Sequence, residues 1–397
     1  MNNFLINAVV ISGRITFCMP FWRAQWTPNQ NFVAGLVFKL LEFGIACLFI
    51  GFHCEIYLWN SVEDLLGTRK LCDHITYILI ISAYIISNFL IRLAGVLYTE
   101  ELSSFVSSLA FLSTNVRIKT GTESVFIIIA FSFLPVLLVV AVQIISSDIS
   151  HIITTNFTLN IFTADLAVYL NCLESIVSYS ALMYAYLFVV VFGILILSIY
   201  EQCVDTFENH YLCSFTEVFP KPFEKFKEDV VGVKRLMDLY SQISGIYFLA
   251  VLYHSALNWF RFLNYLTNDS QVSFLVNSMV LNVFSVVAVG YMACFGNYLT
   301  KRFRDLREKL LAAKANVGLP ESESVWFCKR SNYSFALAEK SRYEVSKLLT
   351  WIITWDWKLS VLDMTDLNHG TFPTVISAIL PCMILIFQLR MSENDSK

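Results

Sequence analysis

Seven stretches of the sequence are long and apolar enough to cross a membrane as helices, and this feature restricts the fold more than any other. A bilayer core of about 30 Å requires about 20 apolar residues in a helix, because each backbone polar group must be paired within the segment. Hydrophobic residues make up 56% of the 397 residues and charged residues only 15%, which excludes an ordinary soluble domain. The stretches are 32–59, 74–98, 124–145, 172–200, 243–263, 272–299 and 371–389. We therefore predict an all-α polytopic membrane protein with seven transmembrane helices.

The distribution of Lys and Arg between the connections predicts the orientation. Cytoplasmic connections of membrane proteins carry an excess of these residues. Of the 28 Lys and Arg residues, 21 fall in the segments 1–31, 99–123, 201–242 and 300–370, and 4 fall in the connections on the opposite side. This difference predicts a cytoplasmic N-terminus and, with seven spans, an extracellular C-terminus.

Glycosylation motifs give a partial check on this orientation. Asn156, Asn268 and Asn394 begin Asn-x-Ser/Thr motifs on the predicted outside, whereas Asn332 begins one on the predicted inside. We expect Asn156 and Asn268 to carry glycans, and we expect a multi-pass protein of the plasma membrane.

These patterns divide the chain into five parts. They are a cytoplasmic N-terminal segment (1–31), a bundle of six spans (32–299) with a cytoplasmic helical loop (201–242), a cytoplasmic helical segment (300–370), a seventh span (371–390) and an extracellular tail (391–397). In the long cytoplasmic segment and just before it, apolar residues recur at helical spacings of three and four, with a basic face opposite: Leu299, Phe303, Leu306, Leu310 and Leu311.

Two arrangements fit this cytoplasmic segment. Its helices can lie at the inner leaflet with Lys and Arg reaching the head groups. Alternatively they pack into a compact domain that buries apolar residues against copies of themselves, namely Trp351, Ile352, Trp355 and Trp357. The length of the connection, 71 residues, favours the packed domain, because idle loops of this size are uncommon.

Motifs that carry chemistry are absent from the sequence. There is no Cys-x-x-Cys pair and no Cys/His cluster with metal-ligand spacing, so we expect no metal and no cofactor. The sequence also lacks a Walker A loop and the motifs of intramembrane proteases, so we do not expect an enzyme. No basic surface with interleaved aromatic residues indicates nucleic acid as a partner.

Four ionisable residues lie inside the predicted spans: Lys39, Glu42, Arg92 and Glu174. Lys39 and Glu42 are three residues apart and can neutralise each other on one helix face. Arg92 lies six residues from the inner end of its span, close enough to extend its side chain to the head groups. We interpret these residues as structural, with ligand contact by Arg92 or Glu174 as the alternative. No row of carboxylates indicates a proton relay.

The last span carries polar groups that lipid cannot pair. In "HGTFPTVISAILPCMILIFQLR", Thr374, Ser377, Pro381 and Gln388 fall on one helical face. Such a stripe can line a contact between helices, as is common in membrane bundles. It can also face water in a pore to which four copies each contribute one stripe.

In architecture the chain resembles the insect gustatory receptor family, and in sequence the resemblance is concentrated in 351–389. That family closes with Thr-Tyr, five apolar residues and then Gln-Phe. The matching stretch of this chain is "PCMILIFQL": Gln388 and the five-residue spacer are present, Pro381 and Cys382 replace Thr-Tyr, and Leu389 replaces Phe. The resemblance implies a tetrameric ligand-gated cation channel whose seventh helix lines the pore and whose preceding helices form a cytoplasmic anchor. It implies that Gln388 and Leu389 form the extracellular gate, with Leu385 one turn deeper and Pro381 on the same helix.

The resemblance also implies a ligand pocket among the outer halves of spans two to six. Aromatic faces with a few amides suit a small organic ligand. The residues that the predicted topology places there are Tyr84, Asn88, Tyr179, Tyr184, His254, Asn258, Trp259 and Asn277.

Taken together, these observations predict a gustatory receptor-like chemoreceptor subunit, opened by a small-molecule tastant as a non-selective cation channel. Its expected partners are the ligand, membrane lipid and related subunits in a homo- or heterotetramer. Two alternatives stay open: an inverted seven-span receptor that signals through cytoplasmic partners without a pore, and a relative that senses light or oxidants.

Overall fold

The described part of the chain is almost entirely helical. The computed structural model describes residues 2–15, 18, 40–41, 44, 47–48, 71–115, 181–208, 220–266, 272–318, 332–361, 365–366 and 370, together with twelve positions between 373 and 392, and in parts of the helices only the backbone. The all-α prediction is confirmed for these residues, with the small exception of two short strands.

The described structure is built of helices and two short strands, and its helical residues include 181–187 and the described positions between 373 and 392. In chain order the elements with described bounds are α1 (Asn2–Ile15), α3 (Leu71–Leu97), α4 (Thr99–Asn115), the π-helix η1 (Phe188–Phe192), α7 (Gly193–Phe207), α8 (Pro220–Leu266), α9 (Val272–Gly318), α10 (Asn332–Thr354), β1 (Ser360–Val361) and β2 (Thr365–Asp366). The strands pair antiparallel, with Ser360 opposite Asp366 and Val361 opposite Thr365. The prediction that 300–370 is helical is therefore wrong for this short stretch.

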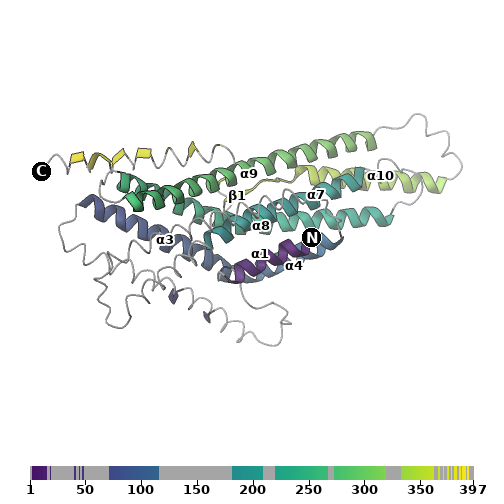
Figure 1. The fold of residues 1–397 in the computed structure, drawn as a ribbon. Helices are drawn as coiled ribbons and strands as arrows, with labels where there is room; N and C mark the ends of the chain where they lie inside the picture. Colours follow the sequence, from purple (N-terminus) through teal and green to yellow (C-terminus); the bar gives the residue numbers. More distant parts are fainter. Residues whose placement is uncertain are drawn as a thin grey trace.

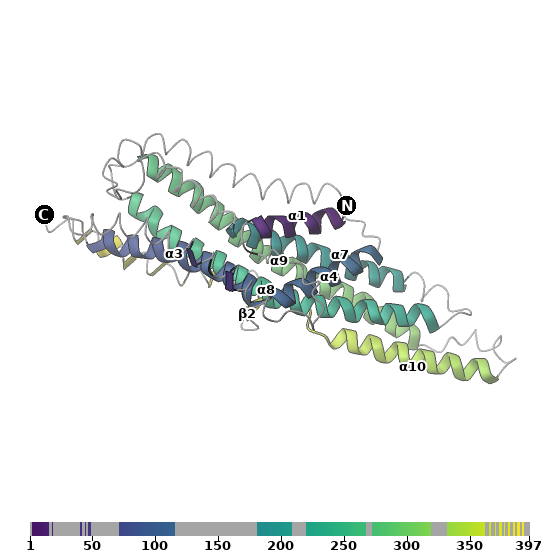
Figure 2. The same ribbon diagram turned by 90° about the horizontal axis from the view of Figure 1, so that it is seen from below.

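Two long helices, α8 and α9, run side by side along the bundle (Figure 1). Each has 47 residues and is about 70 Å long, more than twice the thickness of a bilayer core. Figure 2 shows α3 beside the C-terminal part of α8 and α10 at the opposite end of the bundle. The two long helices therefore connect the region of the predicted spans with the region of the predicted cytoplasmic segment.

The described helices coincide with or contain several predicted spans, and two of them continue into the segments that the sequence predicts to be helical but too polar to span. α3 nearly coincides with 74–98, whereas α8 and α9 contain 243–263 and 272–299 and continue well beyond them. Among the described residues, two helices are long and apolar enough to cross a membrane, Ala181–Phe207 and Glu224–Leu257.

Two of the predicted spans lie wholly or mostly outside the described residues. The span 124–145 lies outside the described residues, and 32–59 is described at only five positions. Lys39, Glu42 and Glu174 also lie outside them.

The N-terminal segment is a packed helix. Ile6 and Val9 of α1 are 2% and 4% exposed. Just beyond α1, the backbone of Cys18 approaches α3 so closely that a Cβ at Gly95 would lie 2.4 Å from the Cys18 carbonyl oxygen. The absence of a side chain at Gly95 is what allows this approach.

An aromatic core holds α7, α9 and the chain after α10 together. The rings of Tyr200, Phe303 and Trp357 lie with centroids 4.4 to 5.4 Å apart. Ile352 of α10 is 1% exposed, so this helix of the predicted cytoplasmic segment packs against other parts of its own chain. This burial favours the packed arrangement of the cytoplasmic segment. The prediction that Ile352 and Trp357 are buried against other copies of the chain is wrong, because both are buried within the single chain.

The helical pattern of α9 is confirmed at four of its five apolar positions. Leu299, Phe303, Leu306 and Leu310 are buried, at 0 to 2% exposure. Leu311 is 44% exposed, so its predicted place in the core is wrong. Leu311 points about 100° away from Leu310 around the helix, which takes it off the buried face at this end of α9.

Candidate functional site

A buried polar contact joins α3 and α8 in the part of the bundle where the ligand pocket is predicted. The Oγ of Ser87 lies 3.4 Å from Nδ1 of His254, within hydrogen-bond distance, and both residues are buried. Nearby, the Tyr253 hydroxyl donates a hydrogen bond of 3.4 Å to the Oγ of Ser82. Polar groups of these kinds inside an apolar bundle could orient a small ligand.

Asn88 and Arg92 form a second polar pair on α3. A guanidinium N–H of Arg92 donates to Oδ1 of Asn88 over 3.0 Å, and Arg92 is only 2% exposed. The prediction that Arg92 extends to the head groups is therefore wrong, because this face of α3 is enclosed by neighbouring elements. Since Asn88 follows Ser87 directly, two predicted ligand residues, Asn88 and His254, lie close to one another.

Aromatic side chains pack together where the helix that carries Tyr184 meets α4 and α8. Tyr184 is fully buried, and its ring centroid lies 5.6 Å from that of Tyr247 on α8. Phe188 lies 5.0 Å from the Tyr247 ring and 5.8 Å from that of Phe105 on α4. Tyr184, predicted as a ligand residue, is thus part of a packed aromatic core that brings a phenol hydroxyl into apolar surroundings.

The helix that carries Tyr184 changes from α-helical to π-helical winding at Phe188, one turn beyond Tyr184. η1 is a π-helix of five residues, and the backbone N–H of Gly193 donates to the carbonyls of both Val189 and Val190. The Tyr240 hydroxyl of α8 donates a hydrogen bond to the same Val189 carbonyl. Single π-turns inside α-helices occur frequently at functional sites.

Gly193 is required at the end of this π-turn by its close neighbours. A Cβ at Gly193 would lie 2.6 Å from a ring carbon of Phe295 and 2.6 Å from the hydroxyl oxygen of Tyr240. We use the name π joint for Phe188–Phe192, Gly193, Tyr240 and Phe295. The sequence pattern did not single it out, although a Gly inside an apolar helical run is a recognised signal of close packing.

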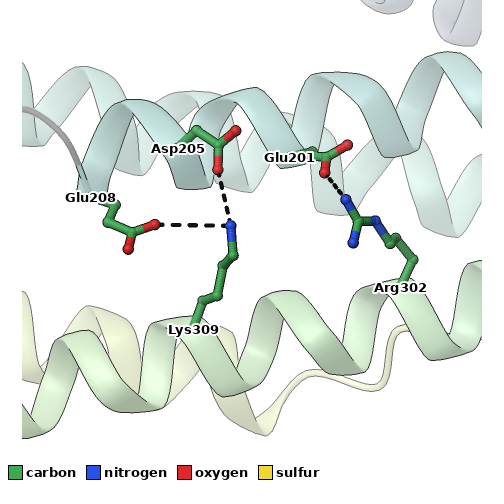
Figure 3. Close-up of polar contacts among 5 residues, drawn as sticks. All are labelled: Glu201, Asp205, Glu208, Arg302 and Lys309. Atoms are coloured by element: carbon green, nitrogen blue, oxygen red, sulfur yellow. Dashed lines mark hydrogen bonds and ion pairs between the residues drawn. The ribbon is translucent and has the colours of Figure 1, made fainter.

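Charged residues join α9 to the C-terminal half of α7 and to Glu208 just after it (Figure 3). Arg302 pairs with Glu201. Lys309 lies 3.4 Å from a carboxylate oxygen of Asp205 and 4.0 Å from one of Glu208. We call these five residues the charged rail. All five side chains are about one-third to one-half exposed, so water screens their attraction.

The predicted gate residues lie on a helical segment that the rest of the described chain leaves uncovered. Pro381, Leu385, Gln388 and Leu389 are all helical and exposed. The polar stripe on the same helix, which includes Pro381 and Gln388, leaves fewer polar groups unpaired than the sequence indicates, because two of its hydroxyls bond within their own helix. Thr374 donates to the Gly370 carbonyl over 2.7 Å, and Ser377 donates to the Thr374 carbonyl over 2.8 Å.

Several candidate site residues are only partly described. Trp259 is half-buried on α8. Tyr84, Asn258 and Asn277 lie on α3, α8 and α9, with side chains outside the described part. The remaining candidates lie outside the described residues altogether, namely Tyr179, Asn156 and Asn268. Within the described part of the chain, no group of His, Cys, Asp and Glu could hold a metal ion.

The fold is similar to that of a solved insect receptor. No protein-family model matches the chain, and no curated protein sequence matches it. The structure of the olfactory receptor OR5 from Machilis hrabei, solved in complex with eugenol, matches with a TM-score of 0.60 at 11% sequence identity, covering 98% of each chain. This similarity confirms the helical receptor fold that the resemblance implied, whereas the orientation of the two termini stays a prediction. It does not test whether the chain belongs to the gustatory branch.

Proposed function

We propose that the protein is a subunit of a gustatory receptor-like chemoreceptor, a non-selective cation channel that opens on binding a small molecule. The observation that carries the proposal is the whole-chain similarity of fold to an insect olfactory receptor. The apolar spans of the sequence and the partial match of its last helix to the gustatory receptor ending support it. The protein would lie in the plasma membrane as a homo- or heterotetramer.

In this proposal the terminal helix lines the pore. Its described side chains, including Leu385 and Gln388, are exposed in a single chain, as the lining of a shared pore would be. Gln388 and Leu389 would form the outer gate, and Pro381 would free a backbone carbonyl that water can pair.

The ligand would contact the polar group between α3 and α8. Ser87 and His254 bring a hydroxyl and an imidazole together, and Asn88 beside Ser87 adds an amide that bonds Arg92. Tyr184 adds an aromatic ring that packs against Tyr247 of α8. These groups suit an organic molecule of modest polarity. Eugenol is the first probe to use, because the receptor of similar fold was solved with it.

Current recording tests the channel. Cells that express the full chain, alone and with related subunits, are exposed to eugenol and a panel of tastants under voltage clamp. We expect a ligand-evoked cation current that Gln388→Ala alters in amplitude or ion selectivity. Leu380→Ala, about a quarter turn away from the polar stripe, is the matched control and should leave the current unchanged.

Other results would contradict the proposal. Ligand-evoked signalling through cytoplasmic partners with no current would favour the receptor without a pore, and responses to light or oxidants alone would favour a sensing relative. A C-terminal tag at Lys397 should be reached by antibody on intact cells, so labelling only after permeabilisation would overturn the predicted orientation.

A further inference from the structure

We propose that the outward face of α9, just beyond its predicted membrane span, binds the anionic phospholipid head groups of the inner leaflet. The residues concerned are Lys301, Arg304 and Arg307, which we call the outward cations. The inference rests on the membrane placement in the proposed function. It goes beyond that function by assigning a lipid class to a defined surface.

The outward cations are the Lys and Arg residues in this part of α9 that do not pair with the neighbouring helices. Between residues 301 and 314 the helix carries six Lys and Arg residues. Arg302 and Lys309 belong to the charged rail and face α7 (Figure 3). Lys314 donates a hydrogen bond of 2.7 Å to the Thr350 hydroxyl on α10. Among the described residues, the outward cations have no ion pair and no side-chain hydrogen bond.

The three outward cations share one side of the helix. At 100° per residue they cover an arc of about 120°, roughly opposite the buried residues Phe303, Leu306 and Leu310. All three side chains are exposed. One exposed carboxylate, Glu308, lies on the same side, and the half-buried Asp305 lies at its edge, so this face still carries a net positive charge.

The depth of the three cations fits a head-group layer. With a rise of about 1.5 Å per residue, they lie about 3, 8 and 12 Å beyond Leu299, where the predicted span ends. The polar layer of one leaflet is about 5 to 7 Å thick, and long basic side chains extend back toward it. Tyr298, 51% exposed, lies beside the predicted end of the span at Leu299, on the side of α9 nearer Arg302, and aromatic residues often occupy this depth at membrane interfaces.

Lipid fits this face better than a second copy of the chain. Above it on the same side of α9, Asn297 is half-buried and Cys294 is exposed, so this side of the helix stays open to its surroundings at the inner end of the predicted span. Anionic lipids of the cytoplasmic leaflet attract basic segments beside a span by about 1 kcal/mol per cation, a factor of about five in binding. The two arrangements left open by the sequence are therefore combined in α9: one face packs and the other reaches the head groups.

Lipid selectivity of the full chain tests the proposal. The protein is reconstituted in phosphatidylcholine bilayers, and the association of spin-labelled phosphatidylserine relative to phosphatidylcholine is measured by electron paramagnetic resonance. We expect a preference for phosphatidylserine that salt at about 0.5 M suppresses. Replacing all three outward cations by Gln should lower the relative association constant at least about fivefold, and each single replacement should lower it partially.

The matched control removes the same kind of charge from the inward face. Arg302→Gln with Lys309→Gln should keep the preference for phosphatidylserine, because those cations are already paired with carboxylates. Equal association of both lipids with the native chain, or equal losses in the two sets of variants, would overturn the proposal. A triple variant that changes the oligomeric mass but not the lipid preference would also overturn it, in favour of a second copy.

This experiment separates the proposal from the proposed function. It uses no ligand and records no current. A chain that conducts but shows no lipid preference contradicts only the lipid proposal, whereas a chain that prefers phosphatidylserine but never conducts contradicts only the channel.

Discussion

The helix that runs from Ala181 through α7 is held in two different ways along its length. At the π joint it is fixed by close packing, where even one added carbon would collide with Phe295 and Tyr240. At the charged rail it is held to α9 by ion pairs between side chains that water reaches. The comparison indicates that the contact at the π joint is rigid and the contact at the charged rail is adjustable. Packing energies change steeply with distance, whereas the interaction energies of screened charges do not.

The largest effect should come from emptying the core of the π joint. Phe188→Ala removes a fully buried ring whose centroid lies within 6.4 Å of those of five other aromatic rings. We expect a loss of about 3 to 5 kcal/mol in the free energy of unfolding. Thermal denaturation in detergent measures it. Phe111→Ala, at a residue 65% exposed, is the control, and equal losses would show that packing does not distinguish the π joint.

Overfilling the same place should cost less. Gly193→Ala places a Cβ against Phe295 and Tyr240, and overpacking of this kind costs about 1 to 3 kcal/mol, partly offset by the better helix propensity of Ala. Gly290→Ala is the matched control, since nothing lies within 4 Å of its Cβ. We expect Tm to fall for the first variant and to stay or rise for the second. The opposite order would mean that the π joint is loosely packed.

Removing one hydroxyl tests the hydrogen bond that supports the π-turn. Tyr240→Phe removes the side-chain donor of the Val189 carbonyl, which keeps the Gly193 N–H as a partner, so the variant should cost only about 0.5 to 1.5 kcal/mol. Tyr298→Phe, at a half-exposed position, is the control. Differential scanning fluorimetry compares the two. A Tm unchanged in both variants would show that the backbone of η1 does not depend on Tyr240.

The smallest effect should come from the charged rail. Glu201→Gln removes one partially exposed partner of Arg302 and should cost about 0 to 1 kcal/mol, a difference that disappears in high salt. Glu308→Gln, on the outward face of α9, should change stability less. The measurement is Tm at low and high ionic strength. A large loss that persists in salt would mean that the charged rail is as rigid as the π joint.

The sequence predicted the helical class, several spans and most of the buried face of α9, because apolar periodicity reports directly which residues avoid water. It predicted Asn88, Tyr184 and His254 as site candidates, and the structure places His254 against Ser87, the residue before Asn88. It did not single out Ser87, the partner of His254, because a serine in an apolar helix carries no signal of which distant helix it will meet. It also predicted a helical loop at 201–242, and the described helices continue past Tyr200 and begin before Ile243, which agrees with that prediction.

By itself, the sequence determined that this chain must bury long apolar helices and that its basic residues gather in particular connections, since both follow from local composition and spacing. Only the tertiary structure decided that Arg92 is enclosed, that Gly193 touches Phe295 and Tyr240, and which cations of α9 are paired. Those outcomes depend on contacts between helices that lie far apart along the chain, and one-dimensional periodicity does not record such contacts.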